Sequence, residues 1–192
     1  MIFPGAVQIP TWDTLVSPKN TRSPACISST GTDTPQRTWS LASRGSRMPF
    51  MKYAKRKGVT IIPEIDVPAH ALAFTRARPE FASKLYGEDH LDLNKSKEIL
   101  PWLESIFREY LTGEDPVFIG PYCHVGTDEY NKKEAEKFRA FTDAMFRMVR
   151  KYGYKTCAWG ALTHAQGYTP VLADTDITLD IWHNPYHNPK QA

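Results

Sequence analysis

From Pro49 onward, short β-branched runs alternate with amphipathic segments, and this alternation constrains the fold more than any other feature. The run VTIIPEID at 59–66 suits a parallel strand that is buried on both faces. Later runs of the same kind predict three further strands, at 116–129, 154–160 and 176–182. Strands that alternate with helices favour a parallel sheet with crossover helices. The fold class is therefore α/β.

The segments between these strands have helical periodicity. Apolar residues recur every three or four positions at 97–111 and 131–153, and shorter helical segments precede them at 49–58 and 71–78. Gly58 and Gly153 stand where a left-handed residue would end a helix. Pro101 is expected to start or to kink the helix that contains it.

Residues 1–47 differ from the rest of the chain, since they are rich in Ser, Thr, Pro, Gly and Arg and lack periodicity. We predict no secondary structure there. An irregular, flexible leader, a ligand-binding arm and a stretch that is not native coding sequence all stay open as interpretations. The predicted domain division is therefore 1–47 as a leader and 48–192 as the folded domain.

The composition narrows the range of partners. The 24 basic and 21 acidic side chains are spread along the chain and give a net charge of +3, so we expect no nucleic-acid or membrane partner. Three cysteines without CxxC spacing indicate neither a disulfide framework nor a structural zinc site. The opening MIFPGAVQIP lacks the pattern of a signal peptide. We expect a neutral or small ligand.

Polar and aromatic residues of interest follow the predicted strands at their carboxyl ends, the edge at which parallel α/β folds bind ligands. Core packing does not readily explain four acids and a histidine at consecutive strand ends. The residues concerned, in chain order, are Glu64, Asp66, His70, Asp128, Glu129, Trp159 and Trp182.

Asp128 and Glu129 are neighbours, so on a regular strand their side chains would face opposite ways. Both enter one cleft only if the backbone leaves the strand there, and Gly126 with Thr127 makes this departure plausible. Two close carboxylates cannot both ionise freely, so the pair can divide into a proton donor and an anion. A DE dipeptide by itself is also common as surface decoration.

Trp159 and Trp182 have two interpretations. Either indole can be part of the core, because tryptophan buries a large area wherever it lies. Beside paired acids, two indoles also suit a sugar, whose C–H face packs on an aromatic ring.

Two motifs resemble glycoside hydrolase family 20, whose members are β-N-acetylhexosaminidases. GVTIIPEIDVPAHA, at 58–71, is similar to the family's strand followed by PE-[FIL]-D and G-H or A-H, and HVGTDE, at 124–129, is similar to H-x-G-[GA]-D-E. Their order and spacing agree with the family over roughly 49–188. The resemblance implies an incomplete (β/α)8 TIM barrel, equivalent to strands 3 to 6.

The resemblance also implies a retaining, substrate-assisted hydrolysis of terminal β-linked N-acetylglucosamine or N-acetylgalactosamine, without cofactor or metal. Glu129 would be the general acid and base, and Asp128 would orient the 2-acetamido group. The residues expected to bind substrate or support the pair are His70, His124, Asp66, Glu64, Trp159 and Trp182. Periplasmic or secreted relatives are common, but no targeting signal is recognised in this sequence.

The sequence departs from the family in two ways. Thr127 replaces the small residue that usually precedes the acid pair. The first-strand arginine has no counterpart in 1–47, and late pocket residues would fall beyond Ala192. Half a barrel leaves sheet edges exposed, so we expect little turnover from the isolated chain.

Two other functions stay open. A metal-dependent barrel hydrolase could use His70, His90 and His124 with the carboxylates, although no HxH or HExxH spacing is present. A noncatalytic carbohydrate-binding relative would keep the cleft without the chemistry.

Overall fold

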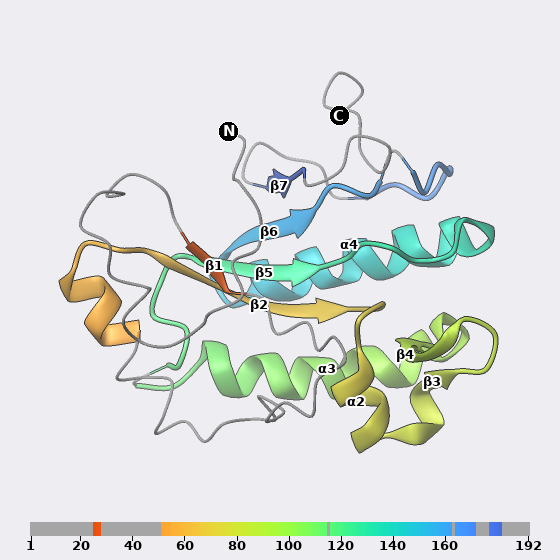
Figure 1. Cartoon of the computed structure of the whole chain (residues 1–192), viewed down its shortest axis with the longest axis horizontal. Helices are drawn as coiled ribbons and strands as arrows, with labels where there is room; N and C mark the ends of the chain where they lie inside the picture. The colour runs from red at the N-terminus through yellow and green to blue at the C-terminus, as the bar shows by residue number, and fades with distance from the viewer. Residues whose placement is uncertain (1–24, 28–50, 115, 163, 172–176, 182–192) are drawn as a thin grey trace.

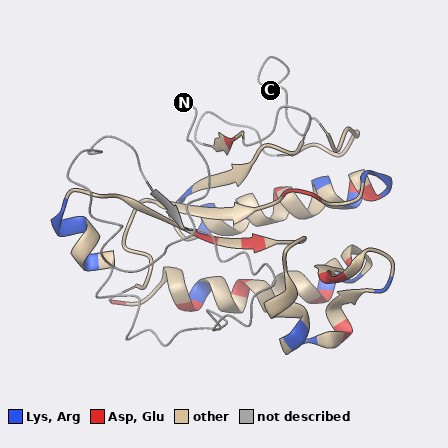
Figure 2. Cartoon of the chain, in the orientation of Figure 1, with Lys and Arg blue, Asp and Glu red and all other residues tan. Residues whose placement is uncertain are grey.

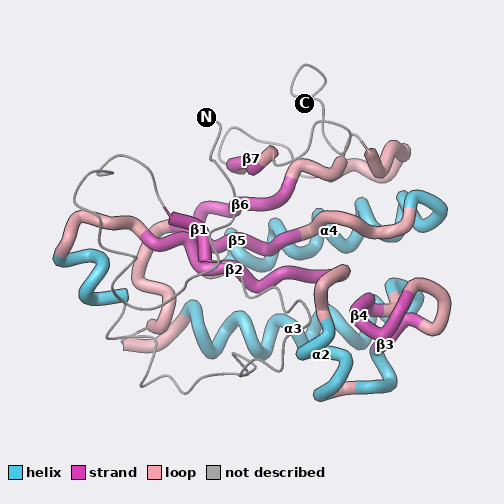
Figure 3. Tube along the Cα trace, viewed as in Figure 1, coloured by secondary structure: helices cyan, strands magenta, loops and turns pink. Residues whose placement is uncertain are grey.

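The computed structural model describes residues 25–27, 51–114, 116–162, 164–171 and 177–181. Strands and helices alternate along this part of the chain (Figure 1, Figure 3). The elements are β1 (Ala25–Ile27), a helix at 51–56, β2 (Ile61–Val67), α2 (Leu72–Ala77), η1 (Pro79–Phe81), β3 (Ala82–Ser83), β4 (Gly87–Leu91), η2 (Leu93–Lys95), α3 (Ser96–Leu111), β5 (Tyr122–Gly126), η3 (Lys132–Glu134), α4 (Ala135–Lys151), β6 (Lys155–Trp159) and β7 (Thr178–Asp180).

Five strands form one parallel sheet in the order β1-β2-β5-β6-β7. The four predicted strands correspond to β2, β5, β6 and β7, and the predicted parallel arrangement is confirmed. All seven residues of β2 are buried, as its continuous β-branched run predicts. Strand order that follows chain order is the arrangement of a parallel barrel segment.

One sequence expectation was wrong. A short strand, β1, lies within 1–47 and pairs with the start of β2, where no secondary structure was expected. Short strands without periodicity are specified by the partner strand, which the local sequence does not show. Helix α3 begins at Ser96, so of the two roles expected for Pro101 the helix start is excluded, and Pro101 lies inside the helix.

Helices α3 and α4 lie alongside the sheet, pack against each other and bury one apolar face each (Figure 1). The largest fully buried side chains of this core include Phe107 from α3 and Phe138, Phe141 and Phe146 from α4. Gly58 and Gly153 have φ of 72° and 82°, which confirms the predicted left-handed helix ends. No helix among the described residues is long and apolar enough to cross a membrane.

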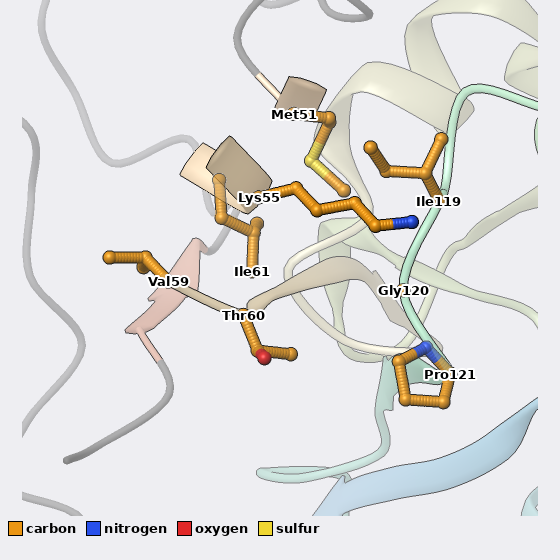
Figure 4. A pocket seen from close by; sticks show the side chains of 8 residues that line it. All are labelled: Met51, Lys55, Val59, Thr60, Ile61, Ile119, Gly120 and Pro121. Carbon is orange, nitrogen blue, oxygen red and sulfur yellow. The ribbon is translucent and has the colours of Figure 1, made fainter. Parts of the chain in front are cut away.

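The carboxyl ends of β2, β5 and β6 point to the same side of the molecule (Figure 1). The small antiparallel pair β3-β4 and helix α2, which contact each other, also lie on this side. At the amino ends of β2 and β5 lies a separate small cavity, away from the polar strand ends (Figure 4). Its lining is mainly apolar and consists of Met51, Lys55, Val59, Thr60, Ile61, Ile119, Gly120 and Pro121.

Candidate active site

The acidic residues predicted at the strand ends come together at the carboxyl edge of the sheet. Glu64 and Asp66 lie on β2, and Asp128 lies two residues after the end of β5, the neighbour of β2 in the sheet. All three are buried, with exposed fractions of 4%, 2% and 6%. Figure 2 shows the corresponding red segments on β2 and after β5. Buried carboxylates at a ligand-binding edge are typical of a reaction site.

The backbone leaves the strand at the acid pair, as the sequence predicted. Gly126, Thr127 and Glu129 have φ of 69°, 64° and 49°, all in the left-handed region. This conformation is unusual for Glu and an outlier for a β-branched residue such as Thr. Strained residues of this kind cluster at functional sites, where the surrounding structure holds them. The turn allows the side chains of Asp128 and Glu129 to approach one partner, His70.

Gly126 is required at its position for a second reason. A Cβ atom built there would lie 1.7 Å from Oδ1 and 2.6 Å from Cα of Asp66. Strand β5 therefore approaches β2 closely at the register pair Val67 and Gly126. Thr127 holds the next position, since its amide donates to the Val67 carbonyl at 3.1 Å and its hydroxyl donates to the Gly126 carbonyl at 2.7 Å.

His70 contacts both members of the acid pair. Its Nε2 lies 2.8 Å from Oε2 of Glu129 and 3.6 Å from Oδ1 of Asp128. The side chains of His70 and Glu129 are 27% and 33% exposed, whereas that of Asp128 is only 8% exposed. Glu129 is therefore the more accessible of the two acids. His70 also has a left-handed backbone, with φ of 53°.

Burial raises the pKa of both inner aspartates. Burial, together with the charges of Asp128 and Glu64, raises the pKa of Asp66 well above its usual range, and a hydrogen bond with the Thr127 backbone opposes the increase. Burial also raises the pKa of Asp128 to about 6, although the nearby His70 opposes the increase. Asp128 is therefore mostly ionised at neutral pH, and burial beside other carboxylates disfavours the charged form of Asp66.

A second group of polar side chains is buried among neighbouring strands of the sheet. The indole Nε1 of Trp159 donates to Oε1 of Glu64 at 2.7 Å, and the same oxygen lies 3.1 Å from Nδ1 of His124. On its other side, Nε2 of His124 lies 3.5 Å from Oδ2 of Asp180. The structure therefore brings Glu64, His124 and Trp159 together, as residues from three neighbouring strands.

Asp180 was missed by the sequence analysis. It ends β7, so the rule that indicates the other strand-end residues also applies to it, and its position at the end of the strand is the signal that could have identified it. Trp182 lies outside the described residues. His90 does not join the site, because it pairs with Asp89 at 2.7 Å and packs against the ring of Tyr130.

Three of the site residues could hold a metal ion. One ligand atom each from Asp66, His70 and Asp128 lies within 4.8 Å of the other two. The donor set of two carboxylates and one imidazole suits several divalent ions. His70 already contacts Glu129 at 2.8 Å, which competes with a role as ligand.

The fold and the site together define a segment of a parallel α/β barrel with a buried acidic site at its carboxyl edge. Comparison with protein families gives the same result, because the model of the glycosyl hydrolase family 20 catalytic domain matches residues 43–140. The chain belongs to this family.

Individual relatives agree with the family match. The chain is 25% identical over 181 residues to lacto-N-biosidase of Bifidobacterium bifidum, covering 80% of this chain and 16% of that protein. It is 33% identical over 154 residues to β-hexosaminidase subunit A2 of Dictyostelium discoideum, covering 69% of this chain and 27% of that protein. The chain thus spans about a sixth to a quarter of these relatives.

A solved structure shares the fold. The β-N-acetylhexosaminidase of Bacteroides fragilis superimposes with a TM-score of 0.61 at 21% identity, over 78% of this chain and 32% of that one. The predicted incomplete TIM barrel is confirmed by this match and by the parallel sheet.

Proposed function

We propose that a protein carrying this segment is a β-N-acetylhexosaminidase-like glycosyl hydrolase that removes terminal β-linked N-acetylhexosamine from glycans. One observation carries the proposal: the left-handed turn after β5 brings the adjacent Asp128 and Glu129 to a single histidine, His70. The names of the similar proteins, a lacto-N-biosidase and two hexosaminidases, support the same substrate class.

In the proposed mechanism, the nucleophile comes from the substrate. The carbonyl oxygen of the 2-acetamido group attacks the anomeric carbon while the bond to the leaving group breaks. Glu129 gives its proton to the departing oxygen, and an oxazolinium ion forms. Glu129 then takes a proton from water as the water attacks the same carbon, which opens the ring with retained configuration. After both steps Glu129 carries a proton again, so the protein is unchanged after one turnover.

The electrostatics of the site suit this division of roles. The oxazolinium ion is cationic and needs a nearby anion, which Asp128 supplies once it ionises above a pKa of about 6. Glu129 is partly exposed and can reach the leaving group. Nε2 of His70, at 2.8 Å from Glu129, holds that carboxyl group in place. Trp159 and Trp182 would line the acetamido pocket.

Binding tests the proposal with the 192-residue chain itself. N-acetylglucosamine thiazoline, a stable mimic of the cyclised intermediate, should raise the thermal midpoint, because a ligand of the folded state stabilises it by about 2.7 kcal/mol at 100 times Kd. Asp128→Asn should reduce this shift, whereas the surface variant Glu104→Gln should retain it. A cooperative melt that the thiazoline does not move would contradict the proposal.

Hydrolysis is tested with the complete protein that carries the segment. Glu129→Gln should reduce kcat on an N-acetyl-β-glucosaminide by at least about 100-fold, the scale of general acid and base catalysis, and leave thiazoline binding in place. Unchanged turnover in this variant would exclude Glu129 as the acid. Binding without any turnover in the wild type would favour the noncatalytic carbohydrate-binding alternative.

A metal-dependent hydrolase is the second candidate, favoured by the approach of Asp66, His70 and Asp128 to within 4.8 Å. This candidate predicts that EDTA abolishes activity and that a divalent ion restores it. Calorimetric titration of the chain with Zn²⁺ and Mn²⁺ provides a direct measurement. Activity that is insensitive to EDTA, with no heat of binding, would eliminate the candidate.

A further inference from the structure

Three ionisable side chains are buried near the acid pair. The interior of barrels of this kind usually carries branched apolar residues instead. The side chains of Glu64 and His124 are 0% exposed, and that of Asp180 is 8% exposed. Isolated charges are costly to bury and therefore need partners. The proposed chemistry uses none of these three residues directly.

The three side chains form a connected unit with Trp159. His124 lies between the two carboxylates, at 3.1 Å from Glu64 and 3.5 Å from Asp180. Oε1 of Glu64 also accepts the indole N–H of Trp159 at 2.7 Å. The rings of His124 and Trp159 meet edge to face, with centroids 4.8 Å apart. The indole is thus held by a hydrogen bond at one atom and by a ring contact along its edge.

We propose that Glu64, His124 and Asp180 form a charge-balanced positioning unit, with His124 as a cation, that fixes the indole of Trp159 in the sugar site. The inference rests on the proposed function for the role of Trp159, because that residue would wall the acetamido pocket. Neither His124 nor Glu64 needs to touch the sugar. Their effect reaches the substrate through the indole.

The charges around His124 support a protonated ring. Glu64 faces it from β2, Asp180 from β7, and Asp128 acts on it from the end of β5. Cys157, its register neighbour on β6, is neutral because burial raises the pKa of the thiol to about 12. Burial alone lowers the pKa of His124, but hydrogen bonds and charge from Asp180 and Glu64 outweigh it and raise the pKa to about 9.

One competing arrangement exists. The amide of Gly126 lies 3.1 Å from Nδ1 of His124, so a neutral ring could accept this hydrogen bond. A lone pair on Nδ1 would then face Oε1 of Glu64, which already accepts from Trp159. That contact is repulsive unless Glu64 is protonated. A cationic ring removes the repulsion with Glu64, because Nδ1–H donates to Glu64 and Nε2–H faces Asp180, but it gives up the hydrogen bond from the Gly126 amide.

Nuclear magnetic resonance of the full chain tests the charge state without any ligand. The ring nitrogens of His124 should both be protonated from pH 6 to 8. Glu64→Gln should lower the titration midpoint of His124, because it removes one anion. Trp159→Phe should raise that midpoint, because Oε1 of Glu64 then no longer accepts the indole N–H and interacts more strongly with the His124 cation. A singly protonated ring at pH 7 in the wild type would overturn the inference, whether or not a variant folds.

Positioning of the indole is tested by exchange and binding. In Glu64→Gln, the indole N–H of Trp159 should exchange about tenfold faster and thiazoline should bind about tenfold more weakly, as expected for one hydrogen bond. Thr156→Val is the control, since Thr156 is buried on β6 outside the unit. Unchanged indole exchange in Glu64→Gln would refute positioning. Absence of thiazoline binding in the wild type would contradict the proposed function alone. The indole exchange rate and the protonation of His124 would still test the positioning unit, because neither measurement needs a ligand.

Discussion

Replacing Gly126 with alanine should destabilise the fold far more than the same change at another left-handed glycine. Gly126 has φ of 69°, a conformation that costs an alanine about 1–2 kcal/mol. The added Cβ would also lie 1.7 Å from Oδ1 and 2.6 Å from Cα of Asp66. Since one of these atoms belongs to the backbone, a side-chain rotation does not relieve the overlap, and β2 and β5 must separate.

The expected loss follows from these two costs. Overpacking of this kind costs about 1–3 kcal/mol, and the lower entropy of the unfolded alanine chain offsets about 0.4–1 kcal/mol. Gly126→Ala should therefore lower the free energy of unfolding by about 1–5 kcal/mol.

Gly58→Ala is the matched control. Gly58 has nearly the same φ, 72°, but nothing lies within 4 Å of its added Cβ. Gly58→Ala should lower the free energy of unfolding by about 1 kcal/mol or less, from backbone strain alone. Urea unfolding followed by circular dichroism measures both variants through their midpoints at constant slope. Equal losses would refute the argument that contact with Asp66 requires glycine at 126.

Three further variants test the electrostatics and hydrogen bonding. Folding raises the pKa of Asp128 from 3.8 to about 6, so the native chain binds this proton more tightly and stability should fall as pH rises through this window. Asp128→Asn should remove that slope in urea titrations from pH 4 to 7 and stabilise the chain at pH 7 by roughly 3 kcal/mol. Tyr130→Phe removes a buried hydrogen bond of 2.8 Å to the Leu91 carbonyl and should cost about 1–2 kcal/mol by the same assay. Lys151→Ala breaks an exposed pair with Glu104, and a measurable loss of stability would contradict the expectation that such pairs contribute little.

Much of the fold follows from local patterns. The β-branched run before Glu64 predicts a strand because its continuous apolar character suits burial on both faces, and β2 is buried throughout. Glycines at 58 and 153 predict helix ends because only glycine adopts φ > 0 without strain, and both do so. The strand β1 was not predictable in this way, since its pairing with β2 depends on a partner distant in sequence.

The candidate site depended more on tertiary structure. The sequence pointed to Asp128, Glu129 and His70, but the contact between His70 and Glu129 at 2.8 Å joins residues 59 positions apart. Likewise, no local pattern indicates that Glu64 and Asp180 lie on either side of His124.

The sequence by itself determined the alternation of strands and helices, the family and the acidic residues at the strand ends. These features are periodic or local, so they depend on near neighbours along the chain. Only the tertiary structure decided that the pKa values of Asp66 and Asp128 both rise, because they depend on burial and on charges from other strands. Desolvation and charge proximity are properties of packed space, and a chain acquires them only when its distant segments meet.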